Sequence, residues 1–180
     1  MSQVKAQQPQ APAAKPAPVP PQAKPEPVRA KELAAKITEA FPDTMVDYAR
    51  ERRLKVSTVP TRIRGIALFT RDRLGFDHIS TVSGVDWIAK NEFEVVYFVG
   101  TVSKPGYEDF VVALAERVAR DDPVVLSLIE VWPGADYHER ETHEMFGINF
   151  RGHPSSAHLI LPEDWSDMPP LRKDYISPGR

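Results

Sequence analysis

The sequence contains no cysteine among its 180 residues. The chain therefore forms no disulfide bond, offers no thiol nucleophile and cannot hold an iron–sulfur cluster with its own thiolates. It also lacks a run of eighteen apolar residues and the apolar centre of a signal peptide, so we expect neither a membrane span nor an export signal. The formal net charge of −2 argues against a protein that binds nucleic acids by neutralising phosphates.

The motifs of common enzyme classes are also missing. The nine glycines are scattered singly, which excludes a Gly-rich phosphate loop and a dinucleotide fingerprint, and there is no GxSxG elbow. A zincin needs HExxH, but His138 and His143 are followed at the fourth position by Thr142 and Gly147. Two pairs could still bind a metal if the fold brought them together: His138 with Glu141, and His153 with His158. A free-standing metalloenzyme using His138 and Glu141 is therefore a distant alternative.

Residues 1–29 differ in composition from the rest of the chain. They contain eight prolines and no aromatic residue, with four basic residues and one acidic residue. Such a segment cannot bury enough apolar surface to offset the entropy lost on ordering it, so we predict a disordered, polyproline-like arm. It is either a solubilising or spacing tail or a docking arm for an acidic partner or a lipid surface.

From residue 30 onwards, periodic apolar patterns predict regular elements. The expected order is a helix at 30–41, strands at 45–48 and 54–59, a helix at 60–74, strands at 78–85, 93–102 and 107–118, and an apolar segment at 124–131. Residues 93–102 are apolar on both faces, which is typical of an internal strand. Residues 107–118 have mixed helix and strand character, and we interpret them as a strand antiparallel to 93–102. These elements predict an α+β domain over residues 30–150, with helices covering a mostly antiparallel sheet.

A short, highly charged helix is predicted at residues 137–146. Asp136 is the expected N-cap, with Glu139 reaching back in a capping box, and Gly147 suits a left-handed C-terminal cap. Its carboxylates could form an acid–base pair, but buried ion pairs are the favoured role. The three acids are Glu139, Glu141 and Glu144, and their expected cationic partners are Arg140, Arg151 and Arg172.

Residues 151–180 are predicted to form an extended C-terminal arm. Prolines at 154, 162, 169 and 170 exclude a helix or a central strand there. Apolar side chains at 159–161, Trp165 and Leu171 would nevertheless be exposed in such an arm, so a surface on this chain or on a partner must receive them. We expect a docking arm ordered mainly by a partner; the alternative is an arm that folds back on its own sheet.

Several segments resemble one known family. The motif ERETHEMFGINFRGHP at residues 139–154 closely resembles the C (30-kDa) subunit of respiratory complex I. The same resemblance extends to DDPVVLSLIEVWPGADYH before this motif, to PPLRKDY at 169–175, and to GFDHISTVSGVDW and EVVYFV within 75–99. Together these segments cover about residues 30–175, so the Pro-rich segment lies outside the resemblance.

The resemblance implies a non-catalytic structural and assembly subunit of the peripheral electron-transfer module of a complex I-like oxidoreductase, with a quinone- or phenazine-type acceptor. Its expected partners are the large D-like, hydrogenase-like subunit and the small B-like iron–sulfur subunit, at the cytoplasmic face of the membrane. No flavin, cluster or metal is expected in this chain, whereas iron–sulfur clusters are expected in its partners. The residues expected at the partner interface are Glu139, Arg140, Glu141, His143, Glu144, Phe146, His153, Trp165, Leu171, Arg172, Lys173 and Asp174.

Two features depart from the family pattern. Ala157 and His158 stand where the family motif usually has arginines, which weakens any salt bridge expected at that point. The sequence continues for five residues after Tyr175, and such short versions resemble subunits of archaeal-type complexes, membrane-bound hydrogenases and sulfur reductases. The equivalent subunit of a membrane-bound hydrogenase or sulfur reductase is therefore the alternative interpretation.

Overall fold

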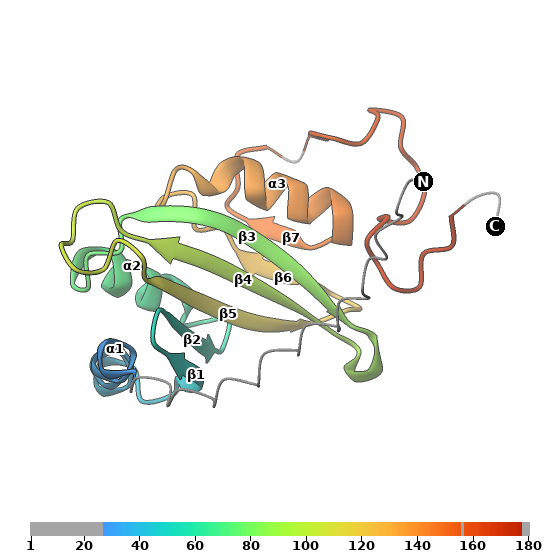
Figure 1. Cartoon of the computed structure of the whole chain (residues 1–180). Helices are drawn as coiled ribbons and strands as arrows, with labels where there is room; N and C mark the ends of the chain where they lie inside the picture. Colours follow the sequence, from blue (N-terminus) through green and yellow to red (C-terminus); the bar gives the residue numbers. More distant parts are fainter. Residues whose placement is uncertain (1–26, 156, 178–180) are drawn as a thin grey trace, which may run out of the picture.

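The structure is a computed structural model that describes residues 27–155 and 157–177. The elements follow in the order α1 (Val28–Ala40), β1 (Met45–Arg50), β2 (Arg53–Thr58), α2 (Ile63–Asp72), β3 (His78–Trp87), the 3₁₀ turn η1 (Ile88–Lys90), β4 (Glu92–Gly100), β5 (Val111–Ala119), β6 (Val124–Leu126), α3 (Ala135–Phe146) and β7 (Asn149–Arg151). This order confirms the α+β class predicted from the sequence. The predicted helices and strands also have the observed types (Figure 1), whereas η1, β6 and β7 were not predicted.

Five strands form the main sheet in the order β1-β2-β5-β4-β3. Neighbouring strands run antiparallel except β2 and β5, which run parallel. β4 lies between β5 and β3, which confirms the prediction of an internal strand at residues 93–102. β5 runs antiparallel to β4, as predicted for residues 107–118. β6 and β7 pair in parallel as a separate two-stranded sheet.

Side-chain alternation divides the main sheet into two faces. One face packs with the helices in a single buried cluster, where apolar residues at alternate strand positions meet the apolar stripes of α1 and α2. From α3, Ala135 belongs to this cluster and the partly buried Phe146 packs against it. This cluster includes Leu33, Ile37, Leu54, Val56, Ile63, Ile66, Phe93, Val95, Tyr97, Val112, Leu114, Trp132 and Ala135. The opposite face carries a smaller buried group of Val96, Ala113 and Ala115.

The start of the first helix differs from the prediction. α1 begins at Val28, two residues before the expected start at Ala30, so that Val28 and Arg29 belong to the folded domain. The Arg29 guanidinium donates hydrogen bonds to the Gly106 carbonyl at 2.6 Å and to Asp109 at 3.1 Å. These long-range contacts explain the earlier start. Residues 1–26, which hold most of the predicted disordered arm, lie outside the described residues.

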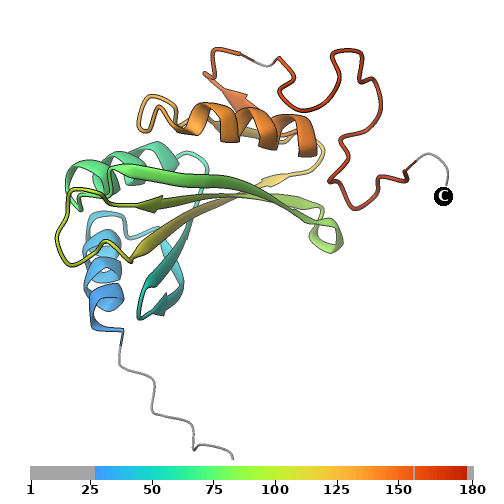
Figure 2. The same ribbon diagram turned by 45° about the horizontal axis from the view of Figure 1, so that its top comes forward.

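The charged helix and the C-terminal arm occupy one end of the molecule. α3 lies along β3, and the arm runs past the end of this helix (Figure 2). Beyond β7 the described part of the arm has no helix or strand, in agreement with its prolines. None of the helices within the described ranges is both long and apolar enough to span a bilayer.

Candidate functional site

The helix α3 starts earlier than the sequence predicts. It begins at Ala135 after Gly134, and the cap residue makes no side-chain hydrogen bond, so the prediction of Asp136 as N-cap is wrong. Gly134 leaves little room for a side chain, because a Cβ there would lie 3.0 Å from Cγ2 of Ile79. The predicted C-terminal cap is confirmed: Gly147 has a φ of 76° and donates its N–H to the His143 carbonyl at 2.7 Å.

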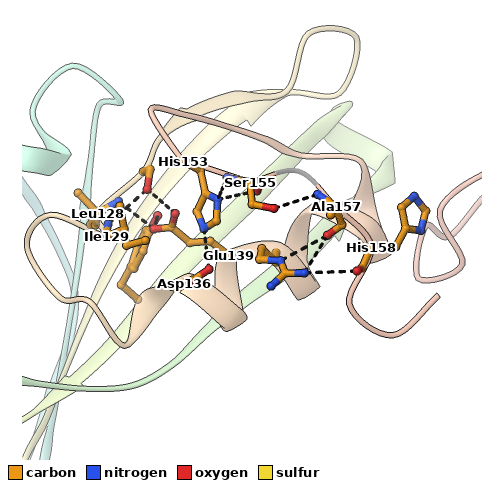
Figure 3. A network of polar contacts seen from close by, with 11 residues as sticks. Leu128, Ile129, Asp136, Glu139, His153, Ser155, Ala157 and His158 are labelled. Atoms are coloured by element: carbon orange, nitrogen blue, oxygen red, sulfur yellow. Dashed lines mark hydrogen bonds and ion pairs between the residues drawn. The ribbon is translucent and has the colours of Figure 1, made fainter. Parts of the chain in front are cut away.

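Glu139 faces the interior of the fold and has neutral partners. Its carboxylate accepts hydrogen bonds from the Ser127 hydroxyl at 2.6 Å, the Leu128 N–H at 2.8 Å and the Tyr97 hydroxyl at 3.1 Å (Figure 3). Burial raises the pKa of Glu139, and these three donors oppose that rise because they favour the charged form. The expectation of an arginine partner for Glu139 is therefore wrong. The residue joins α3 to β4 and to the segment after β6.

Glu144 holds the backbone of the C-terminal arm. Its carboxylate accepts hydrogen bonds from the N–H groups of Leu159 and Ile160, both at 2.9 Å, and of Leu161 at 3.2 Å. His158 approaches the same carboxylate with Nδ1 at 3.9 Å. Consecutive backbone donors converging on one carboxylate form a charge-assisted anchor. The predicted arginine partner for Glu144 is thus replaced by main-chain donors from the arm.

We expect Glu144→Ala to release residues 159–161 from α3 while leaving the sheet intact. The change removes hydrogen bonds to a charged group, which are worth about 1.5–3 kcal/mol each, and the freed N–H groups return to water. Hydrogen exchange of the isolated chain should show faster exchange at residues 159–161. Glu141→Ala is the matched control, because Glu141 is an exposed glutamate on the same helix. Unchanged exchange at residues 159–161 would contradict this role.

Arg140 also contacts the arm rather than an acid. Its guanidinium donates to the Ala157 carbonyl at 3.3 and 3.2 Å and to the His158 carbonyl at 3.3 Å (Figure 3). Ala157 and His158 therefore contribute backbone acceptors at the positions where the family motif usually carries arginines. Together, Arg140 binds backbone carbonyls and Glu144 binds backbone N–H groups within residues 157–161 of the arm.

A cavity of about 330 Å³ lies between α3 and the chain that follows β7. Four of the predicted interface residues line it: Glu139, Arg140, His143 and His153. His143 Nδ1 lies 2.8 Å from the Ile148 carbonyl, and His153 Nδ1 lies 2.6 Å from the Ser155 carbonyl. His153 Nε2 lies 3.3 Å from Asp136 (Figure 3). These histidines are engaged in fixing loops next to α3.

The same residues bear on the question of a metal site. Across the described ranges, no group of three or more His, Cys, Asp or Glu side chains is arranged to hold a metal ion. His153 and His158, which could have formed a ligand pair, contact Asp136 and Glu144 respectively. The geometry of the described residues thus does not favour the metalloenzyme alternative with His138 and Glu141.

The remaining predicted residues lie at the far end of α3, where the arm meets the sheet. The Leu171 N–H donates to the Met145 carbonyl at 3.0 Å, and the Lys173 N–H donates to Asp86 at 2.9 Å. The Arg172 guanidinium lies 5.3 Å from the centre of the Phe93 ring. Phe146 packs edge-on against the same Phe93 ring, with centroids 6.2 Å apart.

An ion pair that the sequence analysis missed anchors this part of the arm. Arg120 at the end of β5 contacts Asp86 of β3 at 3.0 and 3.1 Å, and both side chains are largely buried. Arg120 also contacts Asp174 of the arm at 2.8 Å. Hydrogen bonds from Arg172 first, and from Arg120, hold the pKa of Asp174 below its ordinary value. The one sequence signal for this pair is a charged residue, Asp86, at a buried position of β3.

The arm is fixed through its backbone, yet several of its apolar side chains point outwards. Ile160 and Leu171 are 59% and 55% exposed, and Leu159, Met168 and Ile176 are also exposed. Trp165 is half-buried, with its ring 6.4 Å from that of Tyr175. The arm is therefore not ordered by a partner alone, because its own chain holds it at several points. Exposed apolar groups on a fixed backbone suit docking to another protein.

The comparisons with known proteins agree on one family. Residues 56–180 match the family described as the 30 kDa subunit of respiratory-chain NADH dehydrogenase. The chain is 40% identical over 144 residues to the C subunit of NADH-quinone oxidoreductase from Roseiflexus castenholzii, covering 78% of this chain and 80% of that relative. It is 33% identical over 148 residues to the C subunit of F420H2 dehydrogenase from Methanosarcina mazei, covering 81% and 91%.

A solved structure extends this likeness to the fold. A chain of the membrane-bound sulfane sulfur reductase, an archaeal respiratory membrane complex, superposes with a TM-score of 0.72 at 24% identity. The superposition covers 82% of this chain and 86% of that chain. At this level of identity the match shows that the two share the fold.

Proposed function

Since the chain belongs to the family of the 30 kDa subunit of respiratory-chain NADH dehydrogenase, we propose that it is a non-catalytic assembly subunit. It is a subunit of a complex I-like or related membrane-bound oxidoreductase, so other subunits of that complex are its partners. The finer proposal is that it docks on the large D-like, hydrogenase-like subunit and the small B-like iron–sulfur subunit. It would do so in the peripheral module, at the cytoplasmic face of the membrane.

One observation carries the proposal of docking. The arm presents exposed apolar side chains from a backbone that α3 and the sheet already hold through Glu144, Asp86 and Arg120. A pre-ordered segment loses less conformational entropy on binding than a free one, so more of the contact energy contributes to affinity. Ile160 and Leu171 are the expected anchors, with charged residues around them at the rim.

The cavity beside α3 is proposed to serve the same interface. The side chains of Glu139, Arg140 and His143 that line it have hydrogen-bond partners within the chain. On the same helix, Arg140 is half-exposed and Glu141 is exposed. We propose that this chain holds no redox cofactor of its own and that the iron–sulfur clusters belong to its partners. Its contribution is the shape and position of the surface formed by α3 and the arm.

The electron donor and acceptor belong to the partners in this proposal. Two relatives of similar coverage are named for different reactions, NADH-quinone oxidoreductase and F420H2 dehydrogenase. We propose a quinone- or phenazine-type acceptor for the complex of this chain, with a hydrogenase or sulfur reductase as the alternative. The large subunit that co-purifies distinguishes them, because paired cysteine motifs for a nickel–iron centre imply hydrogen chemistry and their absence implies quinone-type chemistry.

The docking surface is tested with Ile160→Asp and Leu171→Asp in the tagged full-length chain, purified with its complex from native membranes. Each charge placed in an apolar pocket should weaken association by roughly 2 kcal/mol or more, so recovery of the large subunit should fall sharply. Val102→Asp is the control, since Val102 is an exposed apolar residue in the loop after β4. Equal recovery of partner subunits with all three variants would refute docking through this surface.

A further inference from the structure

Glu116 of β5 is a carboxylic acid buried inside the fold, apart from the residues that line the cavity beside α3. Strand alternation places it on the same face as Val112 and Leu114 of the core. The residue is 1% exposed, and within the described part of the chain neither carboxylate oxygen has a hydrogen-bond partner. An ionised carboxylate without partners in such surroundings is strongly disfavoured.

Among the described residues, no positively charged group is found to stabilise an ionised Glu116. Its register neighbours are Thr58 of β2 and Val95 of β4, and the Thr58 hydroxyl is itself buried without a hydrogen-bond partner among the described residues. The titratable groups that act in this region are Tyr97 of β4 and Glu139 of α3, while His153 acts on Glu139 from the chain after β7. Burial and the two carboxylates keep the pKa of Tyr97 well above its ordinary value, so Tyr97 stays neutral.

Glu116 and Glu139 differ in the hydrogen bonds that their carboxylates accept, and this difference decides which of them is neutral. Glu139 accepts three hydrogen bonds that favour its ionised form, whereas Glu116 accepts none within the described ranges. Burial, and then the charge of Glu139, raises the pKa of Glu116 to about 8. Two carboxylates that share a buried region titrate as a pair and do not readily ionise together.

We propose that Glu116 and Glu139 form a coupled acid pair that binds one proton at neutral pH. This proton keeps α3 packed on the sheet. Glu116 belongs to β5 and Glu139 to α3, so ionisation of both would place two like charges across the contact between the sheet and the helix. α3 also anchors the C-terminal arm through Glu144. Release of the proton would therefore loosen the surface that the arm presents.

The direction of the pH dependence follows from proton binding in the two states. The unfolded chain loses the Glu116 proton near its ordinary pKa of 4.5, whereas the folded chain keeps it up to about pH 8. Between these values the native state binds more protons, so stability falls as the pH rises. Above pH 8 this contribution no longer changes, and the native pair carries both charges.

The carboxyl carbons of Glu116 and Glu139 can be followed by NMR in the full chain labelled with ¹³C-glutamate. Glu116→Gln copies the shape of the neutral acid and assigns the Glu116 signal. Glu116 should be neutral at pH 7 and titrate near pH 8, and Glu139→Gln should lower this midpoint by removing the like charge. Glu108→Gln, a change at an exposed glutamate, should leave the midpoint unchanged.

Hydrogen exchange, corrected for its intrinsic pH dependence, tests the link to α3. Protection of the α3 amides should fall about fivefold between pH 7 and pH 8, where the native Glu116 is already losing its proton, and Glu116→Gln should abolish this fall. An ionised Glu116 at pH 7 would overturn the proton-binding pair. An unchanged Glu116 midpoint in Glu139→Gln would overturn the coupling. If α3 protection showed the same pH dependence in wild type and in Glu116→Gln, the effect of the proton on α3 packing would be overturned.

Discussion

Replacing Asp86 by alanine should destabilise the chain by about 3 kcal/mol, at the lower end of the range for breaking a buried ion pair. The Arg120 and Asp86 side chains are 9% and 1% exposed, and they are joined at 3.0 Å. Removing Asp86 leaves a buried guanidinium whose remaining carboxylate partner among the described residues is the partly exposed Asp174, beside its contact with the Phe93 ring. The Lys173 N–H loses its acceptor in the same step, so the arm should detach at this point.

Urea denaturation measures the loss of stability, and hydrogen exchange at Lys173 measures the release of the arm. Asp72→Ala is the control, because the pair of Asp72 with Arg71 is solvent-exposed and such pairs contribute about 0–1 kcal/mol. A loss below about 1 kcal/mol for Asp86→Ala, or unchanged exchange at Lys173, would show that the pair does not anchor the arm.

The sequence predicted the elements that depend on local patterns. β4 was placed inside the sheet because both of its faces are apolar, and Gly147 was placed at the end of α3 because glycine tolerates positive φ. β3 was harder to define, since a register irregularity between Ile79 and Thr81 interrupts its alternation. The predicted start of α3 is wrong because the helix begins after Gly134 without a capping side chain, at a position where a Cβ would lie 3.0 Å from Ile79.

The polar contacts of the site could not be predicted from short windows of sequence. Glu139 bonds to Tyr97, 42 residues away, and Arg120 pairs with Asp86, 34 residues away. Charge matching within the helix and the arm suggested arginine partners, but the fold supplies hydroxyls and backbone N–H groups instead. A backbone donor is available at almost every residue, so the sequence carries no mark of which one will face a given carboxylate.

Gly84→Ala should destabilise the contact between β3 and α3 by about 1–3 kcal/mol, the usual range for overpacking a well-packed core. A Cβ at Gly84 would lie 2.6 Å from Cδ2 and 2.8 Å from Cε2 of the Phe146 ring. The ring also packs edge-on against Phe93, at a centroid distance of 6.2 Å. Either Phe146 must leave its site or α3 must shift away from the sheet.

Gly100→Ala separates this clash from the general effect of adding a methyl group to a strand. The nearest atoms to a Cβ at Gly100 are 3.8 and 3.9 Å away, so this variant should be neutral or slightly stabilising. In thermal unfolding, the melting temperature of Gly84→Ala should therefore be well below that of Gly100→Ala. Adding Phe146→Leu to Gly84→Ala should recover part of the lost stability, because the smaller side chain relieves the overlap. Equal melting temperatures for the two alanine variants would mean that α3 is not closely packed on β3, and the surface formed by α3 and the arm would then lack the rigid support on which the proposed docking depends.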